Sequence, residues 1–190
     1  MPQRIIVGIS GASGAIYGIR LLQIARAAGL ETHLVVTKTA AQTIACETDY
    51  TLKAVHEMAD VVHAATDLGA AISSGSFRTI GMIVAPCSMR SLSEIAYGNT
   101  GGLLTRAADV QLKERRRVVL IAREAPLSLS HLRAMIQATE AGAIVLPPVP
   151  AFYNRPKTLD DIVDHTVGRA LDLFDVESGI VKRWKDSSVS

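Results

Sequence analysis

The sequence predicts an α/β fold, a doubly wound parallel sheet in a three-layer sandwich of Rossmann-like or flavodoxin-like type. Three observations support this prediction. Short apolar runs rich in β-branched residues recur along the chain, segments with a helical pattern separate them, and small residues or prolines follow most of the runs. Because the runs lack the alternation of half-exposed strands, we expect strands that are buried on both faces and joined by right-handed crossovers.

Length and composition fit one soluble domain. The chain has 190 residues, of which 48% are hydrophobic and 20% charged, so we expect a single domain over 1–190, with a core at about 3–176 and a polar tail at 177–190. The formal net charge of +2 gives no indication of a nucleic-acid partner. No apolar stretch approaches the ~20 residues of a membrane span, and no signal-peptide core is evident.

The two cysteines, Cys46 and Cys87, form no C-x-x-C motif and have no histidine cluster nearby. This usage favours neither a disulfide framework nor a zinc site. We therefore expect a reduced, cytoplasmic protein without a metal.

The first predicted strand, 4–9, leads into small residues at 10–14 and a helix that extends to Ala27. The free N–H groups at the start of that helix form a place for an anion, most often a phosphate. Glycines recur there every three residues, at 8, 11 and 14. This spacing matches neither the dinucleotide fingerprint nor the P-loop and favours a mononucleotide phosphate. Close packing of helix against strand is the alternative reason for the glycines.

The later elements are predicted in the same way. Four further strands are expected, at 31–37, 79–85, 118–122 and 143–146, and helices are expected at 38–46, 52–58, from about 88 onward, at 103–117, at 128–140 and after Thr158. Pro86 and Pro147 are expected to end strands, while Thr158 caps the last helix. The segment 64–78, with its SSGS core, and the proline-rich segment 147–157 are loops. The hydroxyls of SSGS either bind a ligand or solvate a turn.

A second strand–turn–helix unit repeats the first, because the strand 79–85 is followed by small polar residues at 87–91. Open parallel sheets bind ligands beyond the carboxyl ends of their strands, so we expect both turns to converge on one site. Arg106, Asp109 and Lys113 share one helix face, which by spacing alone indicates a solvated stripe of ion pairs.

Six motifs then occur in one order and spacing: GISGASGAIYG, SSGS, APCSMRSLSEIAYG, RAADVQLKERR, REAPLSLSHL and PAFYNRP. Together, from about Arg4 to Arg169, they resemble the UbiX-like flavin prenyltransferases, formerly described as aromatic-acid decarboxylase subunits. The resemblance implies a metal-independent enzyme that joins the dimethylallyl group of dimethylallyl monophosphate to N5 and C6 of reduced FMN. It also implies a homo-oligomer, usually a dodecamer, whose product, prenylated FMN, serves a UbiD-type decarboxylase.

The resemblance also assigns residues. FMN contacts fall on Gly11, Ala12, Ser13, Thr37, Ser88, Met89, Arg90, Ser91 and Arg123, and prenyl-phosphate contacts fall on Lys113, Arg123, Tyr153 and Arg169. Acid–base candidates match Glu47 and Glu124, with Ser13 between flavin and substrate. Positive charge suits a departing phosphate, and a carboxylate suits the proton that ring closure at C6 releases. Each residue has a local alternative, such as an Arg123–Glu124 ion pair or packing of Tyr153 within its loop.

Two other functions stay open at this point. One is an FMN-binding accessory subunit without catalysis, and the other is an FMN-dependent decarboxylase of a cysteine-derived substrate. Four converging phosphate donors favour the prenyltransferase, because neither alternative needs them. The chain departs from the family pattern at Leu68, where some members carry tryptophan, and at Arg90 and Ser91 in the second turn.

Overall fold

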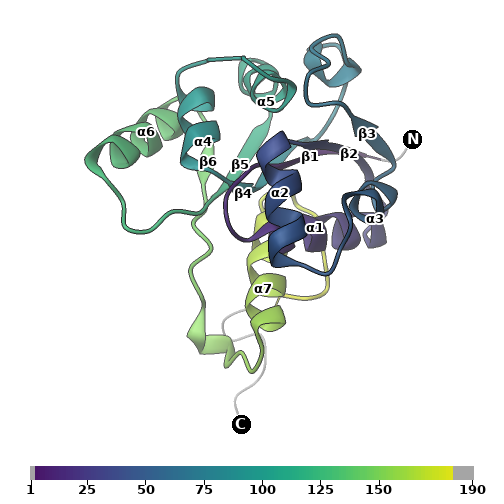
Figure 1. Ribbon diagram of the computed structural model, residues 1–190, viewed down its shortest axis with the longest axis vertical. Helices are drawn as coiled ribbons and strands as arrows, with labels where there is room; N and C mark the ends of the chain where they lie inside the picture. Colours follow the sequence, from purple (N-terminus) through teal and green to yellow (C-terminus); the bar gives the residue numbers. More distant parts are fainter. Residues whose placement is uncertain (1–2, 182–190) are drawn as a thin grey trace.

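The computed structural model describes residues 3–181. Its centre is a six-stranded, all-parallel sheet in the order β3-β2-β1-β4-β5-β6 (Figure 1). The strands are β1 (Arg4–Ile9), β2 (Glu31–Val36), β3 (Val61–His63), β4 (Gly81–Cys87), β5 (Arg117–Ala122) and β6 (Ile144–Val145). The order reverses between β1 and β4, which is where open α/β sheets bind their ligands.

Helices cover both faces of the sheet, as predicted for a three-layer sandwich. One core holds the apolar faces of α1 (Ala15–Ala27), α2 (Lys38–Glu47), α3 (Leu52–Glu57) and α7 (Leu159–Asp172). The opposite core holds those of α4 (Met89–Ala96), α5 (Leu103–Lys113) and α6 (Leu129–Glu140). Ile5, Val7 and Ile9 enter the first core and Ile6 the second, as strand pleating requires.

The predicted helix starts are confirmed where a side chain caps the helix. Thr37, Ser88, Ser128 and Thr158 each accept a hydrogen bond from a backbone N–H three residues on. Thr158 and Asp161 form a reciprocal capping box, so the acidic first turn of α7 belongs to the cap.

Several predicted boundaries were wrong. The strand β4 continues through Pro86 to Cys87, because a register shift between Val84 and Cys87 accommodates the proline. The helix expected at 103–117 ends at Lys113. Arg115 takes a left-handed φ of 58°, and Arg117 already belongs to β5.

The sequence reading also missed β3, an edge strand of three residues with too few apolar positions to show a pattern. In the polar tail predicted at 177–190, residues 182–190 lie outside the described part of the chain, so the predicted domain extent stays a prediction.

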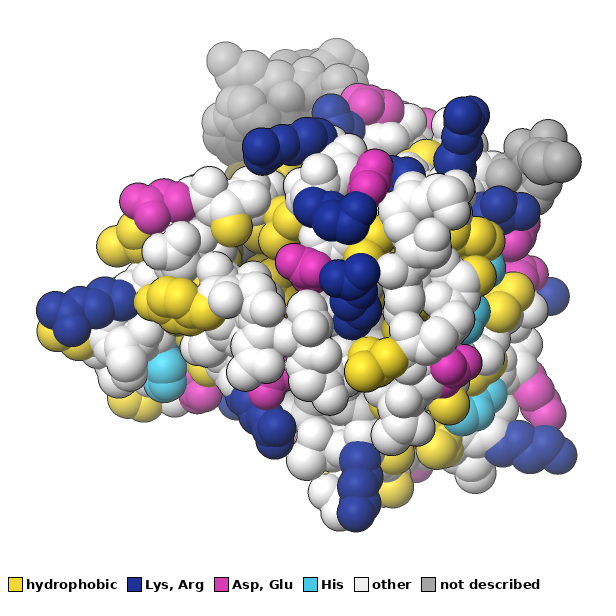
Figure 2. Space-filling view, turned by 90° about the horizontal axis from the view of Figure 1, so that it is seen from above, with side chains coloured by type: hydrophobic (Ala, Val, Ile, Leu, Met, Phe, Trp, Pro, Cys, Tyr) yellow, Lys and Arg dark blue, Asp and Glu magenta, His cyan; other side chains and the backbone are white. Residues whose placement is uncertain are grey.

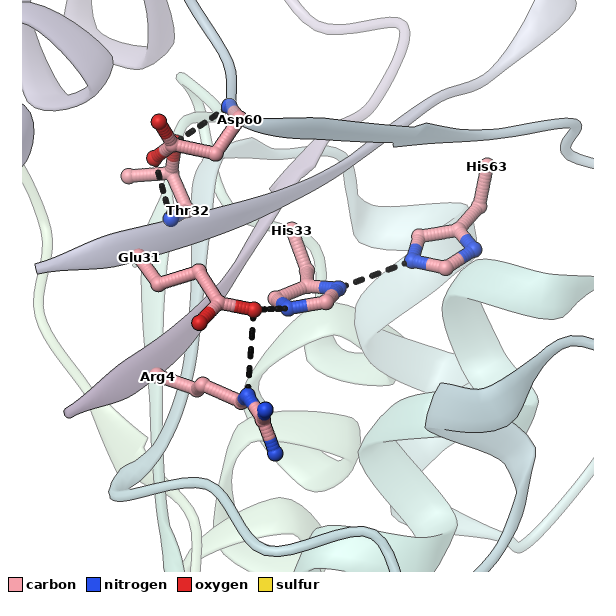
Figure 3. Close-up of polar contacts among 6 residues, drawn as sticks. All are labelled: Arg4, Glu31, Thr32, His33, Asp60 and His63. Atoms are coloured by element: carbon pink, nitrogen blue, oxygen red, sulfur yellow. Dashed lines mark hydrogen bonds and ion pairs between the residues drawn. The ribbon is translucent and has the colours of Figure 1, made fainter. Parts of the chain in front are cut away.

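A chain of polar contacts links the beginnings of β1 and β2 to β3 (Figure 3). Arg4 Nε donates to Glu31 Oε1 at 3.0 Å, and His33 Nε2 lies 3.0 Å from the same oxygen. His33 Nδ1 in turn lies 3.0 Å from His63 Nε2. The Arg4 guanidinium stacks 4.8 Å above the ring of Phe77, so the cluster holds both β3 and the end of the 64–78 loop.

This cluster predicts a pH dependence of stability. Burial, and next the charge of His33, lower the pKa of His63, while Asp67 acts in the opposite direction. Between the lowered pKa of the folded chain and the ordinary histidine pKa, about 6.5, the unfolded chain binds more protons at this position, so stability falls as the pH drops from above 6.5 into this range. We expect the urea midpoint to decrease between about pH 7.5 and 5.5 and the decrease to be smaller in His63→Gln. His56→Gln, outside the cluster, is the control, and equal slopes for His63→Gln and the wild type would contradict the prediction.

Candidate active site

Two clefts open at the carboxyl ends of the strands, one on each side of the turn at 10–14. The first has a volume of about 260 Å³ and lies beyond β1, β2 and β4. The second has a volume of about 380 Å³ and lies beyond β1, β5 and β6. Gly11 lines the first cleft, whereas Ser13 and Gly14 line the second. The turn is therefore the wall that both clefts share.

Ser10 ties this turn to the second turn, which the sequence predicted to converge on the same site. The side chain is fully buried. Its Oγ donates to the carbonyl of Pro86 at 2.9 Å and accepts from the N–H of Ser88 at 2.7 Å. Because both hydrogen bonds of this hydroxyl go to backbone groups at the second turn, Ser10 fixes the distance between the two turns.

The first cleft is lined by hydroxyls, backbone and mixed charge. Five of the nine predicted FMN contacts line it: Gly11, Thr37, Ser88, Arg90 and Ser91. A Cβ at Gly11 would lie 2.4 Å from Cβ of Thr39, so only glycine lets the turn pack this closely on the start of α2. Ala12 bonds within the turn, its N–H donating to Ser10 O at 2.9 Å. Met89 is buried in the core and lines neither cleft.

Sequence reasoning missed several residues of this cleft. They are Lys38, Thr39, Ala65, Glu94, Gly101, Gly102, Leu104 and Thr105. The glycine break GNTGG at 98–102 was the available signal for part of this set, since it places the start of α5 beside the cleft.

The carboxylate of Glu47 occupies the start of α1, where an external anion was predicted. Its Oε2 accepts from the N–H of Gly14 at 2.8 Å and from the N–H of Ala15 at 3.2 Å. Glu47, 33 positions after Gly14, thus already neutralises the helix dipole, which agrees with the interpretation of Gly11 to Ser13 as the floor of the site more than as its anion-binding group. Glu47 is the last residue of α2, and Thr48 caps the end of this helix, so the end of α2 positions the carboxylate at the start of α1.

Electrostatics keep Glu47 ionised. Burial alone would raise the pKa of this carboxyl. The hydrogen bonds from Gly14, from the Ser13 hydroxyl and from Ala15, together with the charge of Arg123, outweigh burial and lower the pKa. The structure thus brings Ser13, Glu47 and Arg123 into one electrostatic group.

The second cleft holds Ser13, Arg123 and Glu124, with Tyr17 and Pro147–Val149 forming further walls. Arg123 directly follows β5, and its N–H donates to the carbonyl of Cys87 at 3.1 Å, so the end of β4 fixes its backbone. The side chains of Arg123 and Glu124 are exposed to the cleft. A guanidinium, a carboxylate and a hydroxyl thus face one space, which suits an anion that leaves while a proton moves.

Tyr153 and Arg169 line neither cleft; Tyr153 lies on an arm that projects from the body of the molecule (Figure 1), whereas Arg169 lies in α7. The arm comprises residues 147–157, which descend from β6, and ends where α7 returns to the sheet. Tyr153 Oη lies 3.4 Å from Nε2 of His165, and Arg169 follows His165 by one helical turn. Arg169 pairs with Asp172 at 2.7 Å. The structure therefore places these two predicted residues near each other.

Lys113 lies away from both clefts. It ends α5 and pairs with Glu114 at 2.5 Å, at the edge of the sheet where β5 begins. Arg123 follows the other end of β5. The six residues of this strand, at about 3.3 Å each, separate its two ends by roughly 20 Å. Within one chain, Lys113 and Arg123 do not converge.

The SSGS segment lies at the same edge as Lys113. The guanidinium of Arg116 donates to the backbone carbonyls of Gly75 and Phe77, and that of Arg106 donates to the backbone carbonyl of Ser73. None of the SSGS residues lines either cleft. The segment packs on α5, while the hydroxyls of Ser74 and Ser76 are exposed and lie 2.9 Å from each other, as expected for a solvated turn.

The surface charges are mixed. On the face shown in Figure 2, Lys and Arg side chains alternate with Asp and Glu and form no broad basic field. Among residues 3–181, no three His, Cys, Asp or Glu side chains are grouped so that they could hold a metal ion. Within the same range, no helix is long and apolar enough to cross a membrane.

Serine- and glycine-lined turns lie at the switch point of this parallel sheet, and the model of the Flavoprotein family matches residues 1–183, so the chain is a flavoprotein. The chain is 56% identical to the flavin prenyltransferase UbiX of Escherichia coli K12, over 96% of this chain and 98% of that protein. It is likewise 56% identical to UbiX of Thauera aromatica, over 95% and 93%. The chain belongs to the UbiX flavin prenyltransferases, enzymes that transfer a prenyl group to a flavin.

Solved structures agree with this assignment. A crystal structure of AnUbiX (PadA1) in complex with FMN and dimethylallyl pyrophosphate has a TM-score of 0.97 and 50% identity, over 99% of this chain and 100% of that chain. A dodecameric, FMN-dependent UbiX-like decarboxylase from Escherichia coli O157:H7 has a TM-score of 0.94 and 50% identity, over 96% and 100%. The cysteine decarboxylase TvaF, at 16% identity and a TM-score of 0.62 over 75% and 88%, shares the fold alone.

Proposed function

We propose that this chain joins the dimethylallyl group of dimethylallyl monophosphate to N5 and C6 of reduced FMN. The observation that carries the proposal is the shared wall at 10–14, which presents Gly11 to one cleft and Ser13 to a second cleft containing Arg123 and Glu124. A flavin and a phosphate ester thus have adjoining places. The crystal structure of AnUbiX with FMN and dimethylallyl pyrophosphate supports this pair of ligands.

The first cleft fits a flavin that carries a phosphate. Thr37, Ser88 and Ser91 offer hydroxyls, and the start of α4 offers the backbone N–H groups of Met89 and Arg90. Lys38 and Arg90 add two cations against one acid, Glu94. When bound, the reduced flavin supplies an electron-rich ring as the nucleophile.

The second cleft fits the prenyl phosphate. The Arg123 guanidinium neutralises the phosphate as its bond to the allylic carbon breaks. Glu124 accepts the proton that the ring carbon C6 releases, and Ser13 lies between the two ligands. Glu47 holds the turn through Gly14 and Ala15, and its lowered pKa suits a positioning role.

We further propose that the active enzyme is a homo-oligomer in which a second copy supplies Lys113. The roughly 20 Å between the two edges of the sheet separates Lys113 from Arg123 within one chain. The dodecameric relative from Escherichia coli O157:H7 supports such an assembly. We place the enzyme in the cytoplasm, where the prenylated FMN passes to a UbiD-type decarboxylase.

Release of inorganic phosphate tests the proposed function. We expect phosphate release from dimethylallyl monophosphate that requires both this protein and reduced FMN, under anaerobic conditions and with EDTA present. A non-catalytic accessory subunit binds FMN without releasing phosphate, and a cysteine-type decarboxylase releases carbon dioxide instead. No phosphate release by an FMN-loaded sample would reject the proposal.

Glu124→Gln should keep FMN bound and lower kcat about a hundredfold, because the amide cannot accept the proton from C6. FMN affinity is measured by flavin fluorescence and turnover by phosphate release. Glu140→Gln, at the exposed end of α6, is the matched control. Undiminished turnover in Glu124→Gln would remove Glu124 from the mechanism.

A further inference from the structure

His165 is a buried histidine that lines neither cleft. It lies in α7, is 9% exposed, and precedes Arg169 by one turn. Its ring meets the ring of Tyr153 edge to face, with 5.7 Å between the centroids and an interplanar angle of 82°. Tyr153 Oη lies 3.4 Å from its Nε2, a long hydrogen bond. The contact joins the tip of the projecting arm to α7.

The position of His165 is fixed by its neighbours in the helix. Asp164 receives two hydrogen bonds from Arg20 of α1, at 2.6 and 3.0 Å. Thr166 bonds back to the carbonyl of Ile162 at 2.9 Å. Because both flanking residues are held, the imidazole is a rigid support, whereas Tyr153 sits on a proline-rich segment with few regular hydrogen bonds.

The unpaired ring nitrogen indicates the tautomer. Nδ1 of His165 is buried and has no hydrogen-bond partner among the described residues. A buried N–H without a partner is rarer in proteins than a buried acceptor without one. The proton therefore belongs on Nε2, which donates to Tyr153 Oη. Burial has the largest effect on the pKa of His165 and lowers it, and the positive charge of Arg169 lowers it further. These effects outweigh that of Asp172, which raises the pKa, so the neutral form is favoured.

With Nε2–H as donor, Tyr153 Oη accepts from His165. We propose that His165 is a positioning residue: it fixes the side chain of Tyr153, a residue that the family resemblance assigns, together with Arg169, to the prenyl phosphate. This inference rests on the proposed function. It predicts that His165 affects the binding of the prenyl phosphate through Tyr153 and does not affect the binding of the flavin.

A double-mutant cycle tests the inference. Tyr153→Phe, His165→Leu and the double variant are compared in KM for dimethylallyl monophosphate, in kcat and in the Kd of FMN. We expect each single variant to raise KM about tenfold, the double variant to raise it no further, and the Kd of FMN to stay within about twofold. His165→Gln retains an N–H donor and should recover most of the affinity, whereas the shorter side chain of His165→Asn should not.

Two groups of outcomes overturn the inference. Effects of Tyr153→Phe and His165→Leu that multiply, or an unchanged KM in His165→Leu, would show that His165 does not act through Tyr153. If His165→Leu does not fold, the Gln and Asn variants decide, and equal KM values for these two reject the role. A wild-type protein that releases no phosphate rejects the proposed function and this inference together, whereas an active wild type with a failed cycle rejects only the inference.

Discussion

Replacing Arg123 with alanine should lower kcat/KM for dimethylallyl monophosphate about a thousandfold, because the departing phosphate would lack a guanidinium in a partly enclosed cleft. Arg123 lines the second cleft with Ser13 and Glu124, and its backbone is fixed by Cys87. Because the substitution removes a contact to the prenyl phosphate and leaves the lining of the first cleft unchanged, we expect the affinity for FMN to change by less than about tenfold. Steady-state phosphate release and flavin fluorescence measure the two quantities.

Two controls separate charge from geometry at this position. Arg123→Lys keeps the positive charge but not the paired N–H donors, so it should recover only part of the rate. Arg133→Ala removes an exposed arginine from α6 and should behave as wild type. An Arg123→Ala enzyme within threefold of wild type would place the phosphate elsewhere.

Two inactive variants are expected to regain activity when they assemble together. We expect Lys113→Ala and Arg123→Ala each to be nearly inactive as pure proteins. If Lys113 of one copy completes the cleft of another, a mixed oligomer contains some sites with both native residues. For equal amounts and random assembly, about one quarter of the sites are intact. Co-expression with two different tags, purification through both tags and phosphate release measure the recovery.

The same experiment detects the opposite arrangement. If Lys113 and Arg123 served one cleft from a single chain, every site in the mixed oligomer would lack one of them and activity would stay at the level of the pure variants. Full activity of Lys113→Ala alone would remove Lys113 from the site. Either result contradicts the proposed sharing of sites between copies.

Much of the fold could be predicted because its signals are local. Buried β-branched runs predicted β1, β2, β4 and β5, and hydroxyl caps such as Ser88 and Thr158 predicted helix starts. The convergence of the first two turns also followed from the sequence, since parallel strands end at one edge. β3 could not be predicted, because three residues at a sheet edge carry no periodic pattern.

The site was harder to predict, because its contacts join residues that are far apart in the sequence. Nothing near Gly14 indicates that Glu47 fills the start of α1. Nothing in the SSGS motif indicates that its backbone serves Arg106 and Arg116. The placement of Lys113 depends on where α5 ends, and that boundary was predicted four residues too late, because Arg115 adopts a left-handed conformation that no local signal announces.

The mass of the flavin product tests the central claim most directly. The protein is incubated without oxygen with reduced FMN and dimethylallyl monophosphate, and the flavin is then extracted and analysed by mass spectrometry. We expect a flavin heavier than reduced FMN by one C5H8 unit, with one phosphate released for each flavin converted. Unchanged flavin, from a sample shown to bind FMN, would contradict the assignment of this chain as a flavin prenyltransferase.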